Sequence, residues 1–196
     1  MPFPAGAQSP EANFWRWFRQ NEPALLLVQT GREPVCGQLA VALQTVSPEL
    51  TFEFGPAEHE RREFIISADG IRDAFPAVKR LAAAAPSLEH WTVIAFRPGR
   101  PGPHVLTVGA LTMTSADILV HAEPDGERTG LVLAMPGYHA TPEKSYEQAA
   151  YLLLDALIGE YAVETRIGFI EFVDSKRKDA RRWIPLEEFA TRARQP

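Results

Sequence analysis

The clearest pattern of apolar and polar positions lies between Phe64 and Gly70. The apolar run Phe64-Ile65-Ile66 stops at Ser67-Ala68-Asp69-Gly70, and a helical pattern follows it as far as Ala85. Consecutive apolar positions are typical of a strand buried on both faces, and Asp-Gly is a frequent turn pair. The pattern therefore predicts a buried strand that leads through a turn into a helix.

Residues 1–48 carry mainly helical patterns. Ser9-Pro10-Glu11 has the composition of a helix start, because serine caps, proline suits the first position and glutamate suits the positive end of the dipole. Trp15 lies off the apolar face of this helix and is expected to cover a neighbouring element. Asn21-Glu22-Pro23 predicts a break, and a further helix is expected from Pro34 to Val46.

The order strand, strand, helix, strand occurs twice along the chain, at residues 50–97 and 117–173. In the first unit the charged run from Glu58 to Glu63 is expected to be a hairpin loop. Trp91 to Phe96 is apolar at almost every position, which predicts a central strand. In the second unit, Leu131 to Met135 holds the place of Phe64 to Ser67, and Ala162 to Val173 is expected to be one long strand.

Together these patterns predict a single α+β domain over residues 1–196. It would contain a largely antiparallel sheet built from the two ββαβ units, with helices mainly on one face. Residues 1–48 would form a helical N-terminal region and residues 174–196 a C-terminal extension. Each unit alone would leave a sheet face bare, so we expect an internal repeat whose two parts share one sheet and one hydrophobic core.

Composition narrows the class of protein. The chain is 45% hydrophobic and 23% charged, which is typical of globular proteins, and its net charge of −5 does not favour nucleic acid as a partner. The single cysteine, Cys36, has no internal disulfide partner, and the N-terminus lacks the pattern of a signal peptide. A cytoplasmic location is therefore expected. No stretch approaches the roughly 20 apolar residues that span a bilayer, so no membrane partner is expected.

Ser67 and Asp69 are candidate catalytic residues, with Gly70 a candidate ligand-binding residue beside them. They follow a strand and precede a helix start, a place that suits an anion. A nucleophilic serine needs an adjacent base, however, and Ile65 and Asp69 stand where a nucleophile elbow has glycines. The favoured alternative is a tight Asp69-Gly70 turn in which Ser67 bonds to the backbone.

Further candidates are His139 for catalysis and Tyr138 and Arg97 for ligand binding. Tyr138 and His139 follow Gly137 in the turn that corresponds to Asp69-Gly70, although a solvated loop histidine is the favoured interpretation of His139. The histidines lack metal-ligand spacing, so no metal site is expected. No phosphate-binding glycine loop or dinucleotide fingerprint is present, so no cofactor is expected.

Two groups of charged residues have alternative interpretations. Glu164 and Arg166 alternate along the long predicted strand and are expected to form a solvent-side charge row, or with Arg97 to line a polar groove. Lys176 to Arg182 is a basic cluster beside Trp183 that could contact phosphates or an acidic partner. A short surface turn is favoured, because no second basic segment with interleaved aromatic residues supports such a contact.

Three parts of the chain, spanning roughly residues 14–172, form a further pattern. They are Phe14-Trp15-Arg16-Trp17-Phe18, Ile65 to Gly70 with Ala85-Pro86 and Trp91 to Phe96, and Leu152 to Asp155 with Gly159 to Tyr161 and Phe169 to Glu171. Together they resemble a family of uncharacterised bacterial proteins with a domain of unknown function. The resemblance implies one domain and no catalytic residues.

The leading hypothesis is a non-catalytic binding or protein-interaction domain whose partner is another protein. The alternative is a small-molecule-binding enzyme, such as a hydrolase, that uses the two strand-to-helix turns. A homodimer formed by pairing of exposed edge strands is a further alternative. The enzyme hypothesis requires Ser67, Asp69, Arg97 and His139 to converge on one pocket.

Overall fold

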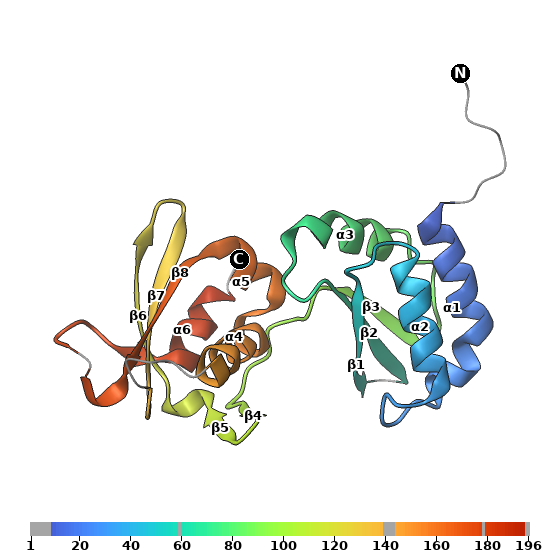
Figure 1. Cartoon of the computed structure of the whole chain (residues 1–196). Helices are drawn as coiled ribbons and strands as arrows, with labels where there is room; N and C mark the ends of the chain where they lie inside the picture. The colour runs from blue at the N-terminus through green and yellow to red at the C-terminus, as the bar shows by residue number, and fades with distance from the viewer. Residues whose placement is uncertain (1–8, 59, 139–143, 178, 195–196) are drawn as a thin grey trace. The chain divides into compact units, whose positions relative to one another are not determined.

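The computed structural model describes residues 9–58, 60–138, 144–177 and 179–194, and the chain divides into two units, Met1–Phe96 and Arg97–Pro196 (Figure 1). Helices and paired strands occur in both units, and four of the six strand pairs among the described residues are antiparallel, which confirms the α+β class. The two units are described in turn.

In the first unit, two helices precede a three-stranded sheet, and a third helix connects the second and third strands of that sheet. β2 is the central strand, antiparallel to β1 and parallel to β3. This position explains why Phe64, Ile65, Ile66 and Ser67 are all buried. The elements are α1 (Pro10–Leu26), α2 (Pro34–Gln44), β1 (Thr51–Glu58), β2 (Arg61–Ser67), the 3₁₀ turn η1 (Arg72–Ala74), α3 (Phe75–Ala83) and β3 (Trp91–Ala95).

Helix α1 begins as the sequence predicts and ends later than expected. Ser9 Oγ accepts a hydrogen bond of 3.2 Å from the N–H of Ala12, and Pro10 is the first helical residue. The predicted break at Asn21-Glu22-Pro23 is wrong, because Pro23 lies inside the helix. Proline removes one backbone hydrogen bond, but burial of Leu25 in the core holds the last turn in place.

Two strand predictions for the first unit also need correction. The expected loop from Glu58 to Glu63 is largely strand, since the β1–β2 ladder continues to the pair Glu58 and Arg61. Charged residues at an exposed strand end are compatible with backbone pairing. The segment Trp91–Ala95 is an edge strand of its sheet instead of the central one. Its apolar character reflects the packing of Trp91 and Val93 against the core.

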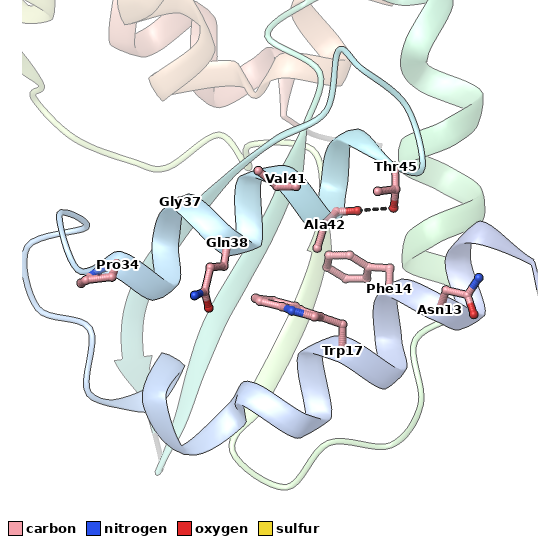
Figure 2. A pocket seen from close by; sticks show the side chains of 9 residues that line it. All are labelled: Asn13, Phe14, Trp17, Pro34, Gly37, Gln38, Val41, Ala42 and Thr45. Carbon is pink, nitrogen blue, oxygen red and sulfur yellow. Dashed lines mark hydrogen bonds between the residues drawn. The ribbon is translucent and has the colours of Figure 1, made fainter.

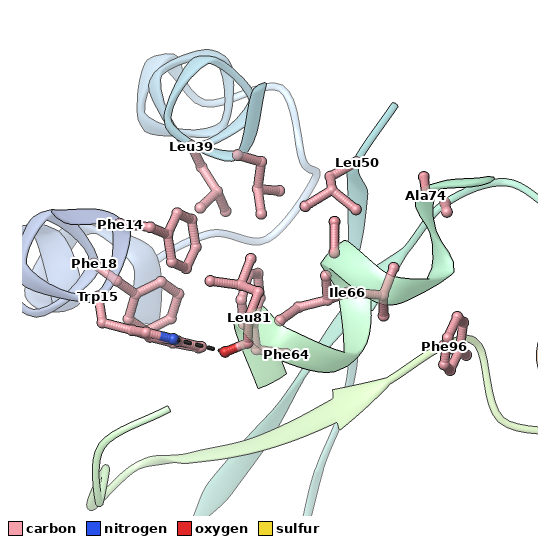
Figure 3. Packing of buried hydrophobic residues seen from close by; sticks show 14 of the residues in the cluster. Phe14, Trp15, Phe18, Leu39, Leu50, Phe64, Ile66, Ala74, Leu81 and Phe96 are labelled. Carbon is pink, nitrogen blue, oxygen red and sulfur yellow. Dashed lines mark hydrogen bonds between the residues drawn. The ribbon is translucent and has the colours of Figure 1, made fainter. Parts of the chain in front are cut away.

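Aromatic rings of α1 and β2 pack together in the core of the first unit (Figure 3). Phe18 on α1 lies 4.8 Å from Phe64 on β2 and 5.4 Å from Trp91 on β3, measured between ring centroids. Trp15 is also buried, and its indole Nε1 donates a hydrogen bond of 2.8 Å to the carbonyl oxygen of Leu81 on α3. α1 is thereby attached both to the sheet and to α3.

The second unit combines a four-stranded sheet, a separate hairpin and three helices. The strand order is β8-β7-β6-β9, and β7 is antiparallel to β6 and parallel to β8. The elements are β4 (Val105–Val108), β5 (Leu111–Thr114), the 3₁₀ turn η2 (Ser115–Asp117), β6 (Leu119–Asp125), β7 (Arg128–Met135), α4 (Lys144–Ile158), α5 (Glu160–Arg166), β8 (Ile167–Asp174), the 3₁₀ turn η3 (Ser175–Arg177), β9 (Ile184–Pro185) and α6 (Leu186–Ala193).

The long strand predicted from Ala162 to Val173 is wrong in its first part. Residues Glu160–Arg166 form α5, and only Ile167–Asp174 are strand. The fully buried carboxylate of Glu160 accepts a hydrogen bond of 3.1 Å from the N–H of Arg97, and the N–H of Glu160 donates to the carbonyl of Arg97 at 3.0 Å. These contacts fix a helix start directly after Gly159, and Val163 then packs into the core.

The three predicted strands of each unit are present in the predicted order and with the same directions, but two helices, α4 and α5, precede the third strand of the second unit. In each case the second strand is central, antiparallel to the first and parallel to the third. Like the run from Phe64 to Ser67, the run from Leu131 to Met135 is buried throughout, as its central position requires. Both buried runs thus lie in interior strands, whereas the apolar run Trp91–Ala95 lies at the edge of its sheet.

The expectation that both parts share one sheet and one hydrophobic core is wrong. Trp91–Ala95 and Ile167–Asp174 lie in separate sheets, and the buried apolar residues form one cluster in each unit. Each unit covers its sheet with helices outside the ββαβ order, namely α1 and α2 in the first unit and α6 in the second. Neither sheet therefore needs the other to cover its apolar face.

Candidate functional site

Ser67, Asp69 and Gly70 build a tight turn between β2 and η1. Ser67 Oγ is buried and accepts a hydrogen bond of 3.0 Å from the N–H of Asp69, and the N–H of Ile71 donates to the carbonyl of Ala68 at 2.9 Å. Asp69 and Gly70 have φ values of 49° and 78°, in the region that glycine adopts easily and aspartate tolerates. The serine hydroxyl thus supports the backbone of the turn.

Tyr138 and Arg97 lie at opposite ends of α4. The ring of Tyr138 is 6.0 Å from that of Tyr146, in the first turn of the helix, whereas Arg97 is bonded through its backbone to Glu160, just beyond the last turn. At about 1.5 Å per residue, the 15 residues of α4 separate the two places by about 22 Å. The structure does not bring them together, and His139 lies outside the described residues.

The polar tip of Tyr138 is held in a partly apolar environment. Its ring also lies 5.7 Å from that of Phe172 on β8. Burial, and next the negative charge of Glu147, raise the pKa of the Tyr138 hydroxyl. Tyr138 is therefore a neutral, packed side chain that joins β8 to the start of α4.

In the basic cluster before β9, Asp179 binds Arg181. The carboxylate of Asp179 accepts a hydrogen bond of 2.9 Å from the backbone N–H of Arg181 and pairs with Nε of the same arginine at 2.7 Å. These contacts, the backbone hydrogen bond first, lower the pKa of Asp179. The Arg181 guanidinium lies 5.9 Å from the ring centre of Trp183. The side chain of Arg182, in contrast, lines a pocket.

That pocket, of about 560 Å³, lies in the second unit and is lined by residues of β6, β7, β8, β9, α5 and α6 and of the segment before β9. Its polar lining includes Arg166, Arg182, Arg192, His121 and Thr129. Its apolar lining includes Val120, Ile167, Ile184 and Phe189. None of the described residues that line it is acidic, so the pocket combines positive charge with apolar surface. It is called the arginine pocket below.

Three separate segments bring the arginines to this place. Arg166 is the last residue of α5, and its Nη1 donates a hydrogen bond of 3.2 Å to the carbonyl of Ala193. Arg192 lies on α6 and pairs with Glu188, one turn earlier on the same helix. Arg182 precedes β9, which pairs with β6. The β6–β9 pairing and the packing of α6 thus assemble the arginine pocket.

His121 attaches the segment around Arg182 to the sheet. Its Nδ1 lies 3.0 Å from the carbonyl oxygen of Arg182, and because a carbonyl only accepts, Nδ1 carries the hydrogen. Its Nε2 lies 3.5 Å from the carboxylate of Glu123, and its ring is 6.1 Å from that of Trp183. The position of Arg182 therefore depends on the imidazole and on the β6–β9 pairing.

Guanidinium groups suit the binding of anions more than proton transfer. Arginine stays charged at all pH values of biological interest and offers five N–H donors in a planar fork that matches a carboxylate or phosphate. The apolar residues of the arginine pocket offer a surface on which hydrocarbon can pack. The arrangement can therefore hold a molecule with an anionic head and an apolar body.

Local sequence patterns indicate parts of this site but not the whole. Arg182 belongs to the predicted basic cluster, and Arg166 belongs to the predicted charge row, although it lies at a helix end instead of on a strand. For Arg192 the local signal is a Glu188–Arg192 pair at helical spacing. The convergence of the three side chains depends on tertiary contacts between segments far apart in the sequence.

No family model, curated protein or solved structure matches this chain. Among the described residues, histidine, cysteine, aspartate and glutamate do not gather in any group of three that could hold a metal ion. No helix in the described ranges is both long enough and apolar enough to cross a membrane. The functional argument therefore rests on the geometry of the arginine pocket.

Proposed function

We propose that the protein is a non-catalytic binding protein for a small organic anion, held in the arginine pocket. The ligand joins a carboxylate or phosphate group to a short apolar part. The observation that carries the proposal is the presence of Arg166, Arg182 and Arg192 around one apolar-lined hollow.

Charge supports an anion as the ligand. The chain as a whole has a net charge of −5. The arginine pocket has the opposite charge, because it is lined by three arginines and by no acidic residue among those described. The side chain of Arg182 makes no hydrogen bond or ion pair within the part of the chain that the structure describes. Its guanidinium is therefore available to a ligand.

Size and lining support a small amphipathic ligand. Small-molecule sites commonly occupy about 300–1,000 Å³ and are mostly apolar with a few polar groups that fix orientation. The arginine pocket, at about 560 Å³, has this combination. Phe189 and Ile184 supply apolar surface, and Thr129 adds a hydroxyl that can donate to an anionic oxygen.

The direct test is a titration of the full chain, followed by amide chemical shifts, with three eight-carbon probes: octanoate, octyl phosphate and octylammonium. We expect the two anions to shift the amides of Thr129, Ile167 and Ile184, and octylammonium to leave them in place. The tighter of the two anions identifies the head group. Shifts with octylammonium equal to those with the anions, or no shifts at these amides, would contradict the proposal.

A further inference from the structure

The exposed face of α2 carries no charge. The helix sequence Pro34–Gln44 contains no acidic or basic residue, and its solvent-exposed positions include Gly37, Gln38 and Val41. Val41 is 63% exposed and adds apolar surface to this uncharged face. A Cβ placed on Gly37 would meet no atom within 4 Å, so the backbone of α2 is open to close approach there.

A hollow of about 590 Å³ adjoins this face, between α1 and α2 (Figure 2). Phe14 and Trp17 project into it from α1, and Gln38 lies beside the indole of Trp17. Solvent-exposed helix surfaces normally carry charged side chains. An uncharged, partly apolar face beside an apolar hollow is instead typical of the centre of a protein–protein interface.

We infer that this face binds a second copy of the same chain, with the two α2 helices antiparallel. In a two-fold interface each residue near the axis lies close to its own copy, so a charged residue there would meet a like charge. The exposed face of α2 avoids this repulsion, because it is uncharged. Gly37 allows the partner helix to approach the backbone closely.

Charges at the two ends of α2 fit the antiparallel direction. Arg32 lies just before the helix and Glu49 lies shortly after it, and both side chains are exposed. Neither side chain makes a hydrogen bond or ion pair within the part of the chain that the structure describes. Antiparallel pairing brings Arg32 of one copy to the end of the interface at which the partner's Glu49 lies, whereas parallel pairing would bring like charges together.

The test is sedimentation of the full-length chain over a concentration range up to about 200 μM, where a homodimer of moderate affinity is populated. The key variant is Val41→Glu, which introduces a charge at the centre of the face. Its matched control is Val105→Glu, since Val105 is 69% exposed and lies on β4 of the second unit. We expect Val41→Glu to raise the dimer dissociation constant at least about tenfold, and Val105→Glu to leave it within about twofold.

A charge exchange tests the direction of pairing. We expect Arg32→Glu or Glu49→Arg alone to weaken the dimer, and the double variant to return the dissociation constant to within about twofold of the original value, because the opposite charges are then restored. A wild-type chain that stays monomeric over the whole range overturns the inference. Equal effects of Val41→Glu and Val105→Glu, or a double variant weaker than both single variants, also overturn it.

Discussion

The indole Nε1 of Trp15 on α1 donates a hydrogen bond of 2.8 Å to the carbonyl oxygen of Leu81 in the last turn of α3, 66 residues away. Carbonyls in the last turn of a helix lack a partner within the helix, and the N–H of Ala85 bonds to Ala82 instead. Trp15 therefore satisfies a buried acceptor and joins two helices that are distant in the sequence.

We expect Trp15→Phe to lower the free energy of unfolding by about 1–3 kcal/mol, because the buried carbonyl of Leu81 would lose its donor while most of the aromatic area stays. Trp17→Phe is the matched control, since the Trp17 indole N–H makes no hydrogen bond within the described residues. Urea unfolding followed by circular dichroism measures both variants. Equal losses for the two variants would show that the hydrogen bond is not responsible.

Glu33 gives the first unit a pH-dependent contribution to stability. Its carboxylate accepts hydrogen bonds from the backbone N–H groups of Thr30 and Gln29, at 3.0 and 2.9 Å, and these lower its pKa from 4.5 to about 2. Because the folded pKa is below the unfolded value, the contribution is complete above about pH 4.5 and is lost as pH falls toward about 2.

We therefore expect Glu33→Gln to lower the urea midpoint near neutral pH and to have a progressively smaller effect between about pH 4.5 and 2. Glu89→Gln is the control, because Glu89 is exposed and has no hydrogen bond among the described residues. Its effect should be small at every pH. A Glu33→Gln effect that is constant across this range would contradict the role assigned to the carboxylate.

Gly99 allows the loop after Arg97 to pass close to the end of α4. The N–H of Arg100 donates to the carbonyl of Ala156 at 2.8 Å, and a Cβ on Gly99 would overlap the backbone carbonyl of Ile158. We expect Gly99→Ala to destabilise the second unit by about 1–3 kcal/mol, because backbone atoms must move to admit the methyl group. A free energy of unfolding within about 0.5 kcal/mol of wild type would show that the loop adjusts without cost.

The separate cores lead to an expectation about fragments. Residues 1–96 and 97–196 each contain a sheet, its covering helices and a closed cluster of buried apolar residues. We expect each fragment, expressed alone, to give dispersed amide spectra and a cooperative unfolding transition. A fragment with the narrow spectrum of an unfolded chain would show that its core is incomplete.

Local signals in the sequence predicted much of the fold. The cap at Ser9, the buried runs Phe64 to Ser67 and Leu131 to Met135, and the turn at Asp69-Gly70 all depend on neighbouring residues, and all are present. Trp15 was also expected to cover another element, and it contacts α3.

The predictions that were wrong depend on contacts between distant residues. Pairing between residues far apart in the sequence decides which strands share a sheet. The local patterns of the two ββαβ units therefore do not show whether the units form one sheet or two. The alternation at Glu164 and Arg166 fits a strand, but the buried carboxylate of Glu160 bonded to Arg97 starts a helix there. The arginine pocket likewise needs the pairing of β9 with β6, which joins only Leu119–Pro185 and Val120–Ile184.

The most direct test of the proposed function is the dissociation constant of octanoate, measured by calorimetry for Arg182→Ala and Arg128→Ala. Arg128 lies on β7 next to Thr129, and successive residues of a strand point to opposite faces, so it serves as the control. We expect Arg182→Ala to raise the constant by about tenfold or more, as loss of a charged hydrogen bond does, and Arg128→Ala to change it by less than about twofold. Equal constants for both variants and the wild type would contradict the assignment of the arginine pocket as the anion site.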